Sequence, residues 1–250
     1  MDKEPIINVK NLIIKYEDSL ILDNINFDIF QGEIFIVLGS SGCGKSTLLR
    51  HLIGLNKVFS GQVIIDGQDI TNCSDDLFYK TLRKIGVLFQ GGALIGSMTV
   101  AENVALPIIE YSGLSKSVVD NLVKLKLSMV GLVDYADYLP SEISGGMKKR
   151  AGLARALALN PKILFLDEPS AGLDPITSAE LDELILNINK NLGMTMVIVT
   201  HELESIFRIA QRIIMLDKQT KGIIAEGDPL FLKNNSQNPY VKQFFNRTVR

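Results

Sequence analysis

The stretch GSSGCGKST, residues 39–47, constrains this chain of 250 residues more than any other part of the sequence. It satisfies the pattern G-x-x-x-x-G-K-[ST], it follows the apolar run EIFIVL, and it leads into the run STLLRHLIGL. This context predicts a strand, a glycine-rich loop and a helix in succession, and such a loop is typical of phosphate binding. The alternative, a glycine-rich turn at an ordinary corner between a strand and a helix, does not require the fixed positions of the pattern.

Each part of this loop has a physical task in nucleotide binding. Glycines let backbone N–H groups curve around phosphate oxygens, and the start of the following helix adds the positive end of its dipole. Lys45 is expected to reach the β and γ phosphates, and the hydroxyl of Ser46 is expected to bind Mg²⁺. The residues that we expect to contact the nucleotide are Gly39, Ser40, Ser41, Gly42, Cys43, Gly44, Lys45, Ser46 and Thr47.

Two carboxylates follow the apolar run ILFL at residues 163–166. Asp167 is expected at the carboxyl end of a core strand, where α/β sheets bind ligands, and is expected to hold Mg²⁺ through water. Glu168 comes next and is interpreted as the general base that polarises the attacking water. A helix cap after the strand is the alternative role for this pair of carboxylates.

A second glycine-containing stretch, ISGGMKKR at residues 143–150, is typical of a helix start that binds an anion. Ser144 is the expected N-cap, and Gly145 and Gly146 leave backbone N–H groups exposed. Because one nucleotide already has its own phosphate loop, we interpret this stretch as serving a nucleotide held by a second copy of the chain in a two-fold dimer. An ordinary capped helix is the alternative. The cations at 148–150 fit either local positive charge near the shared site or a solvated helix face.

The wider pattern predicts an α/β core with a parallel sheet. The runs that are typical of strands are 8–16, 20–30, 33–39, 61–67, 162–167 and 194–200. The last two are nearly all apolar, as expected for strands that are covered on both faces. Between them apolar residues recur at helical spacing, with Asp174 as the expected N-cap, Pro175 at the first helical position and Gly193 beyond the end.

Three further polar residues stand at the ends of predicted strands. Tyr16 is suited either to stacking on an adenine ring or to packing in a β layer. His201, taken alone, fits a structural role better than a functional one, since a lone histidine is more often structural. Gln90 closes the run KIGVLFQ in the same way and says little by itself.

The composition argues against several other functions. The net charge of −2 does not favour nucleic acid as a partner. Cys43 and Cys73 have neither a metal-binding spacing nor a disulfide framework, as is typical of a reducing cytoplasm. The N-terminal MDKEP predicts no signal peptide, and the longest uncharged run, residues 85–101, is too short to span a membrane. We therefore expect that any membrane function works through a partner.

Over essentially its whole length the sequence resembles the ATPase subunits of ATP-binding-cassette (ABC) proteins. The matching motifs follow the family's order: Tyr16 for the adenine platform, GSSGCGKST for Walker A, Gln90 for the Q-loop, ISGGM for the signature, ILFLDE for Walker B, SAGLD for the D-loop and His201 for the H-loop. The resemblance implies ATP and Mg²⁺ as cofactors and adenine stacking for Tyr16. It also implies metal contact and transport coupling for Gln90, a catalytic contact with the γ-phosphate for His201, and a nucleotide contact for Asp174.

The resemblance further implies the architecture and the assembly. The fold would be that of a P-loop NTPase, with a mainly parallel core sheet, an N-terminal antiparallel β subdomain and an inserted helical subdomain at about residues 91–160. Residues 1–250 would form one ABC ATPase domain, whose tail at 228–250 either contacts a partner or frays as an amphipathic end. In this family the helical region docks on a membrane permease, so we expect a homodimer on the cytoplasmic face of the inner membrane.

Four stretches narrow the resemblance within the ABC family. They are FQGGALIGSMTVAENVALP, SGGMKKRAGLARALALNP, DEPSAGLDPIT and NPYVKQFFN. Together they are similar to the ATPases of mammalian-cell-entry type lipid transporters, the group that contains the Mla (maintenance of lipid asymmetry) systems. This similarity implies phospholipid transport between bacterial membranes. The implied partners are a permease, a lipid-binding protein with the cell-entry domain and a small STAS-domain protein.

Two other functions stay open. Methionine importer ATPases have a similar stretch at residues 90–107, so import of a small solute is the main alternative. A soluble ABC mechanoprotein that acts on ribosomes or DNA is less favoured, because such proteins typically join two cassettes or insert long coiled coils, and this sequence has one cassette and no heptad array. The signature departs from the usual LSGGQ at Ile143 and Met147, but its serine and glycines remain, so we expect activity to survive.

Overall fold

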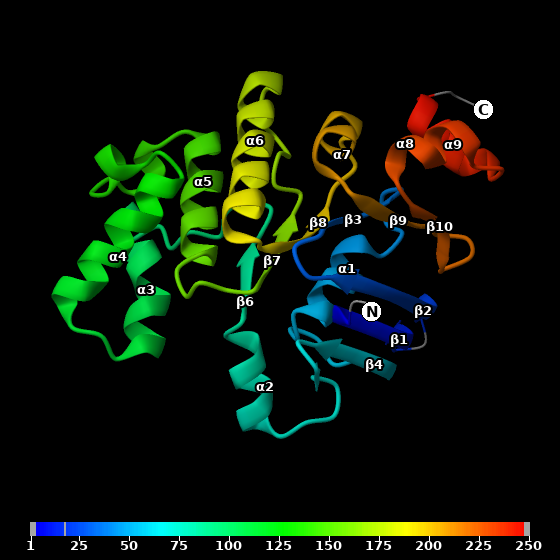
Figure 1. Ribbon diagram of the computed structural model, residues 1–250, viewed down its shortest axis with the longest axis horizontal. Coiled ribbons are helices and arrows are strands. Elements are labelled where there is room, and N and C mark those ends of the chain that lie inside the picture. The colour runs from blue at the N-terminus through cyan, green and yellow to red at the C-terminus, as the bar shows by residue number, and fades with distance from the viewer. Residues whose placement is uncertain (1–3, 18, 248–250) are drawn as a thin grey trace.

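The computed structural model describes residues 4–17 and 19–247, which form two β-sheets with helices around them (Figure 1). The smaller sheet has the strand order β2-β1-β4-β5, and its neighbouring strands pair antiparallel. Its strands are β1 (Pro5–Tyr16), β2 (Ser19–Phe30), β4 (Ser60–Ile65) and β5 (Gln68–Asp69). The antiparallel β subdomain implied by the family resemblance is confirmed, and its strand β1 ends at Tyr16.

The larger sheet forms the core and has the strand order β10-β9-β3-β8-β7-β6. Its strands are β3 (Ile34–Gly39), β6 (Ile85–Leu88), β7 (Ile163–Asp167), β8 (Thr195–Val199), β9 (Arg212–Leu216) and β10 (Ile223–Gly227). Neighbouring strands pair in parallel, except that β10 runs antiparallel to β9 at one edge. Strands β3 and β8 are buried along their whole length, which explains their nearly continuous apolar sequences. The predicted mainly parallel core sheet is confirmed.

Helices pack around this core, and some of them form a separate group at one end of the molecule. They are α1 (Lys45–Leu52), α2 (Asp75–Leu82), α3 (Val100–Ser112), α4 (Lys116–Met129), α5 (Gly145–Ala156), α6 (Pro175–Leu192), α7 (Leu203–Ile209), α8 (Pro229–Asn235) and α9 (Pro239–Asn246), with short 3-10 turns η1 (Val133–Tyr135) and η2 (Pro140–Glu142). Figure 1 shows α3, α4 and α5 together beyond α6, and all three lie between β6 and β7 in the sequence. This is the inserted helical group that the resemblance implies. Among the described residues, none of the helices is both long and apolar enough to cross a bilayer.

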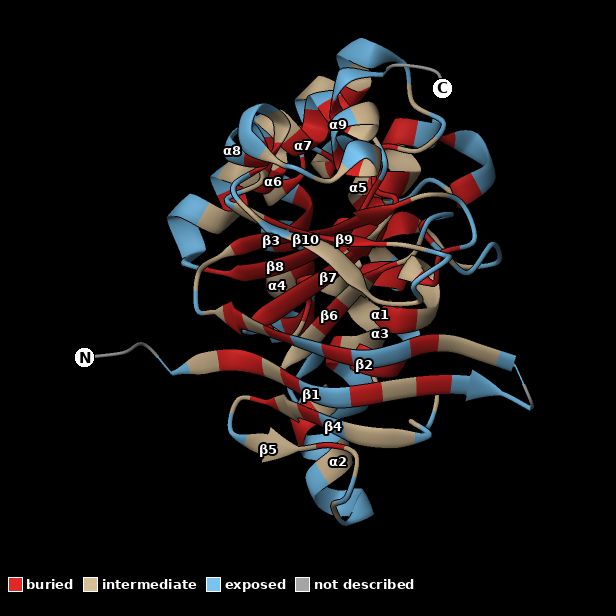
Figure 2. Cartoon of the chain, turned by 90° about the vertical axis from the view of Figure 1, so that its right-hand side faces the viewer, coloured by how far each residue is buried: buried red, intermediate tan, exposed pale blue. Residues whose placement is uncertain are grey.

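Different layers cover the two faces of the core sheet. Ile34, Ile36 and Leu38 of β3 pack in one cluster with α5, α6 and α7. Phe35 and Val37 pack in the other cluster with α1 and the antiparallel sheet. Figure 2 shows the antiparallel sheet as a separate layer alongside the core sheet, with buried residues between the two. Because successive side chains of a strand point to opposite faces, α1 and α5 lie on opposite sides of the core sheet.

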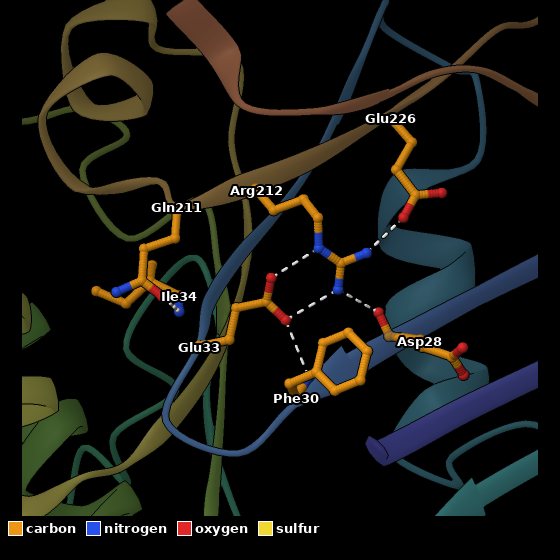
Figure 3. Close-up of polar contacts among 7 residues, drawn as sticks. All are labelled: Asp28, Phe30, Glu33, Ile34, Gln211, Arg212 and Glu226. Carbon is orange, nitrogen blue, oxygen red and sulfur yellow. Dashed lines mark hydrogen bonds and ion pairs between the residues drawn. The ribbon is translucent and has the colours of Figure 1, made fainter. Parts of the chain in front are cut away.

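Arg212, at the start of β9, joins the two sheets (Figure 3). Its Nε donates to Glu33 Oε1 at 2.7 Å and its Nη2 donates to Glu33 Oε2 at 2.9 Å. The same Nη2 donates to the backbone carbonyl of Asp28 in β2 at 2.6 Å, and Glu226 in β10 accepts a bond from Nη1. A bidentate arginine–carboxylate pair fixes geometry as well as charge. Strand β2 is therefore held against the edge of the core sheet formed by β9 and β10.

The boundaries of α6 agree with those predicted from the sequence. Asp174 is the N-cap, and its Oδ1 accepts from the N–H groups of Ile176 at 3.0 Å and Thr177 at 3.1 Å. Pro175 stands at the first helical position, where a missing N–H does no harm. Gly193 ends the helix with φ 61°, a left-handed conformation that glycine adopts readily. This helix is thus specified by local chemistry at both ends.

The C-terminal segment folds back onto the core. Asn238 caps α9 by accepting a hydrogen bond from the Tyr240 N–H at 2.9 Å. Val241 and Phe245 of α9 are buried in the same cluster as α5 and α6. The interpretation that the tail frays is therefore wrong for α8 and α9, while residues 248–250 of the predicted tail lie outside the described residues. Contact of this tail with a partner stays a prediction.

Gly86 in β6 allows the end of α5 to approach the sheet closely. A Cβ at this position would lie 2.2 Å from the Ala156 carbonyl oxygen and 2.7 Å from Leu164 Cδ2. Replacing Gly86 with alanine is therefore expected to lower the free energy of unfolding by about 1–3 kcal/mol through overpacking. Chemical denaturation measures this change. Gly96→Ala is the control, because a Cβ at Gly96 meets no heavy atom of the described chain within 4 Å, and equal losses in the two variants would contradict the explanation.

Candidate active site

The phosphate loop connects β3 to α1 and leaves the start of α1 open to an anion. Gly44 is the N-cap of α1 with φ 101°, a conformation that residues other than glycine rarely adopt. Glycine also has no side chain that can accept a hydrogen bond from the first N–H groups of the helix. A phosphate group would supply those acceptors and would be favoured by the positive end of the helix dipole.

Lys45 begins α1 and turns its ammonium group back onto the loop. Its Nζ donates to the carbonyl oxygens of Gly39 at 3.0 Å and Ser40 at 3.1 Å. The cation is therefore placed at the loop that it is predicted to serve. Cys43 is buried in the same loop, and burial raises the pKa of its thiol above the usual value. The thiol is thus protonated at neutral pH and adds no negative charge beside the predicted phosphate site.

Ser46 and Asp167 meet where α1 faces the end of β7. The Ser46 hydroxyl donates to Asp167 Oδ1 at 3.3 Å. Burial raises the pKa of Asp167, and the bond from Ser46 acts in the opposite direction. A hydroxyl and a carboxylate side by side are oxygen ligands of the kind that Mg²⁺ accepts, and the positive charge would offset the burial of the carboxylate. The residues present therefore fit the predicted metal.

Glu168 and His201 form a contact that the sequence did not predict. The His201 Nδ1 donates to Glu168 Oε1 at 2.9 Å, across the ends of the adjacent strands β7 and β8. Glu168 Oε2 is buried and has no hydrogen-bond partner among the described residues. A buried carboxylate oxygen normally has a partner, so this atom is free to accept a proton or a hydrogen bond from a bound water. The arrangement suits the predicted general base.

Gln90 and Tyr16 each stand at or just after the end of a strand, in different sheets. Gln90 follows β6, which pairs in parallel with β7, so it stands at the sheet edge that carries Asp167. Tyr16 is 43% exposed, and its hydroxyl accepts a hydrogen bond from Asn56 Nδ2 at 2.7 Å. Its ring centroid lies 6.2 Å from that of His51 in α1. The tyrosine ring is thus anchored at its tip while part of it remains open for stacking.

The signature stretch lies on the far side of the core sheet from the phosphate loop. Ser144 is the N-cap of α5, as predicted, and its hydroxyl oxygen accepts from the Met147 N–H at 3.2 Å. Gly145 and Gly146 form the first turn of this helix. Because α1 and α5 cover opposite faces of the sheet, the fold does not bring these two helix starts together within one chain. The arrangement is compatible with the predicted site shared between two copies.

A family model described as ABC transporter matches residues 22–171, which is more than half of the chain. This chain belongs to the ABC transporter family. Members of the family are ATPases, so the chain is an ATP-binding protein that hydrolyses ATP.

Relatives within the ABC family carry different transport names. The chain is 42% identical over 240 residues to the "Probable ribonucleotide transport ATP-binding protein mkl" of Mycobacterium leprae, covering 96% of this chain and 68% of that protein. It is 41% identical over 244 residues to the methionine import ATP-binding protein MetN of Carboxydothermus hydrogenoformans, covering 96% and 72%. It is 38% identical over 261 residues to the intermembrane phospholipid transport system ATP-binding protein MlaF of Haemophilus influenzae, covering 96% and 98%.

A solved ABC structure has the same fold. The dimeric post-hydrolysis state of the ATP-binding cassette MJ0796, bound to ADP and Pi, superposes with a TM-score of 0.80 at 35% identity. The match covers 89% of this chain and 98% of that chain. The P-loop ABC ATPase fold expected from the sequence is therefore confirmed.

Lys149 of this ABC cassette needs a different description from the one that the sequence suggests, whereas Asp174 caps α6 as predicted. Lys149 was expected on a solvated face or near the shared site, but it is only 6% exposed, and its Nζ donates to the backbone carbonyls of Gln90 and Glu168. A solvated face is therefore wrong for Lys149, and no sequence pattern marked its contacts. The Asp174 carboxylate caps α6, and its hydrogen bonds, first of all that from the Thr177 hydroxyl, lower its pKa. Its predicted nucleotide contact stays a prediction.

Proposed function

We propose that this ABC protein hydrolyses ATP to power phospholipid transport between bacterial membranes. The observation that carries the ATPase site is the meeting of two pairs at the ends of β7 and β8, Ser46 with Asp167 and Glu168 with His201. Support for the lipid comes from the four stretches similar to cell-entry type transporters and from the relative MlaF, whose name states phospholipid transport.

In the proposed reaction, the antiparallel sheet and the core sheet each bind one part of ATP. Tyr16 stacks on adenine, and residues 39–47 enclose the phosphates. Glu168 Oε2 accepts a proton from the attacking water, while His201 holds Oε1 and so orients the carboxylate. Mg²⁺ supplies positive charge to the phosphate oxygens when it is bound. The residues proposed to hold it are Ser46, Gln90 and Asp167.

The proposed assembly is a dimer on a permease. Residues 1–250 form one ABC ATPase domain, with a helical subdomain at about 91–160, and two copies place the signature of each against the phosphate loop of the other. Support comes from the position of α1 and α5 on opposite faces and from the dimeric state of the relative MJ0796. The dimer binds the permease at the cytoplasmic face of the inner membrane, beside a cell-entry-domain protein and a small STAS-domain protein.

A mixture of two inactive variants tests the shared site. Lys45→Ala removes the phosphate loop's cation and Ser144→Arg blocks the signature, so each variant alone is expected to lose ATP turnover. In a mixed dimer one phosphate loop and the opposite signature are both intact, so mixing is expected to restore part of the turnover, measured as phosphate release.

The control for this experiment mixes Lys45→Ala with Glu168→Gln. Both changes affect the same half of the site, so each site of the mixed dimer keeps one defect and turnover stays absent. A shared site would be contradicted if the first mixture stayed as inactive as its components. Recovery in both mixtures would show that the halves are assigned wrongly.

Co-purification tests the proposed transport function. The chain is tagged at its natural expression level, membranes are solubilised gently, and associated proteins and lipids are identified by mass spectrometry. A permease, a protein with the cell-entry domain and bound phospholipid are the expected result. Ribosomes or DNA-repair proteins without a permease would overturn the transport function altogether.

Import of a small solute is the second candidate, and a specific observation favours it. The methionine import relative MetN is 41% identical to this chain, slightly more than the phospholipid relative MlaF at 38%. Under this alternative the same purification yields a permease with a solute-binding protein and no lipid. The ATPase site and its variants would then behave as described, because substrate selectivity resides in the partners.

A further inference from the structure

Lys149 is a buried cation at the junction of three functional motifs. It lies in the second turn of α5, the helix that starts with the signature, and is only 6% exposed. Its Nζ donates to the backbone carbonyl of Gln90 and, at 3.0 Å, to that of Glu168. Burial of an ammonium group is unfavourable unless it is hydrogen-bonded, so these two carbonyls explain how the fold tolerates it. The lysine thereby joins the signature helix to the Q-loop and to the proposed general base.

The backbone of Glu168 is held at both of its polar groups. Its φ is 47°, a left-handed conformation that is unfavourable for a residue with a side chain and persists only where the surroundings impose it. Its N–H donates to the Val199 carbonyl in β8 at 2.8 Å, and its carbonyl accepts from both Lys149 Nζ and the Ala171 N–H, the latter at 3.2 Å. The direction of the Glu168 carboxylate depends on this backbone, which also sets its contact with His201.

The segment that follows Gln90 is held by the same helix. Arg155 of α5 donates to the carbonyls of Ala93 at 2.7 Å and Gly92 at 2.9 Å. A Cβ at Gly152 would lie 3.0 Å from the Gly92 carbonyl oxygen, so helix and segment are in close contact. Residues 90–93 and α5 therefore form one packed unit. Within the described residues, this unit is joined to Glu168, the proposed general base, by the hydrogen bond that Lys149 donates to the Glu168 carbonyl.

The charges around Lys149 favour a positive ammonium group beside the carboxylates of the proposed active site. Burial lowers the pKa of Lys149 from its usual value, and the negative charges of Glu168 and Asp167 act in the opposite direction. The ammonium group thus lies within electrostatic reach of both carboxylates at the end of β7. Lys126 is the other lysine buried to this extent in the described helices. Its ammonium group bonds the side chain of Asn160, and burial lowers its pKa with no described charge acting in the opposite direction.

We propose that Lys149 is a positioning residue for ATP hydrolysis. It ties the backbone of Glu168 to the signature helix α5 and to Gln90 of the Q-loop. The Glu168 carboxylate therefore faces the attacking water only when α5, the Q-loop and the end of β7 hold these relative positions. This inference rests on the proposed role of Glu168 as general base. It adds a physical link between the proposed nucleotide site and the helical subdomain that is predicted to face the permease.

The test compares Lys149→Met with Lys126→Met in the full-length chain. A misplaced catalytic group costs up to about 100-fold in rate, so we expect Lys149→Met to lower kcat by about 10–100-fold. KM for Mg-ATP is expected to change little, because Lys149 bonds backbone carbonyls rather than the predicted nucleotide contacts. Lys126→Met removes an equally buried lysine, bonded to Asn160 Oδ1 at 2.5 Å, and is expected to change thermal stability but not kcat.

Two further variants separate positioning from simple structural support. Lys149→Arg keeps a cation with several donors and is expected to recover part of kcat, whereas Lys149→Gln, which keeps a donor but no charge, is expected to recover less. If Lys149→Met does not fold, this pair supplies the same comparison. The proposal is overturned if Lys149→Met or Lys149→Gln turns over at the parent rate. It is also overturned if Lys126→Met loses as much kcat for the same loss of stability.

Glu168→Gln, measured in parallel, keeps the two proposals distinguishable. If Glu168→Gln loses turnover while Lys149→Met keeps it, the general base stands and the positioning role fails. If Glu168→Gln turns over at the parent rate, the assignment of the general base fails, and the positioning role that rests on it fails with it.

Discussion

Replacing Glu168 with glutamine lowers the rate of ATP hydrolysis by about 10²–10⁴-fold, the contribution of a positioned general base. Glutamine keeps the shape of the side chain, but its amide cannot take a proton from water. Nucleotide binding is expected to persist, because the phosphate loop is untouched. The variant should therefore accumulate as an ATP-bound dimer. Phosphate release measures the rate, and size-exclusion chromatography with and without ATP measures the dimer.

Glu183→Gln is the matched control for this change. Glu183 is an exposed carboxylate on α6, so the same substitution there alters charge without touching the site. Its turnover is expected to equal that of the parent chain. If Glu168→Gln hydrolysed ATP as fast as this control, Oε2 of Glu168 would not be the proton acceptor, and the buried unpartnered oxygen would need another explanation.

Replacing Lys45 with alanine is expected to weaken ATP binding by about 10–100-fold, since a hydrogen bond to a charged group contributes roughly 1.5–3 kcal/mol. Turnover should fall with it, because the ammonium group is also predicted to neutralise charge on the β and γ phosphates. Titration with a fluorescent ATP analogue measures the affinity. A thermal melt checks that the loop still folds without the bonds from Lys45 to the carbonyls of Gly39 and Ser40.

Lys57→Ala controls for the loss of one positive charge in the same region. Lys57 is exposed and follows α1, and its removal is expected to leave ATP affinity unchanged. An unaltered affinity in Lys45→Ala would remove the claim that residues 39–47 bind phosphate. A loss that also appeared in Lys57→Ala would point to net charge rather than to a specific contact.

The parts of the fold that depend on local chemistry were predictable from the sequence. Asp174, Pro175 and Gly193 mark the two ends of α6 because caps act within one turn of a helix. Ser144 marks the start of α5 for the same reason. The nearly continuous apolar runs of β7 and β8 predicted strands covered on both faces, because such a strand has no need for alternation.

Contacts between distant parts of the chain were not predictable in this way. Glu168 and His201 are 33 residues apart and meet only because β8 pairs with β7 in the core sheet, an order that no local pattern specifies. Lys149 was placed on a solvated face or near the shared site because lysine is rarely buried, and its partner Gln90 is 59 residues away. The site therefore follows from motifs, while its internal hydrogen bonds follow from tertiary packing.

The position of α1 and α5 on opposite faces of the core sheet has a genetic consequence under the proposed dimer. A cell that makes both an intact and a defective version of this chain assembles mixed dimers. In each mixed dimer the defect inactivates one site, and the intact copy supplies the other half of that site. Each mixed dimer would still contain one complete site, so a single inactive allele would lower transport without abolishing it while a normal gene is present. Two inactive alleles would complement each other when one lesion lies in the phosphate-loop half of the site and the other in the signature, whereas two lesions in the same half would not.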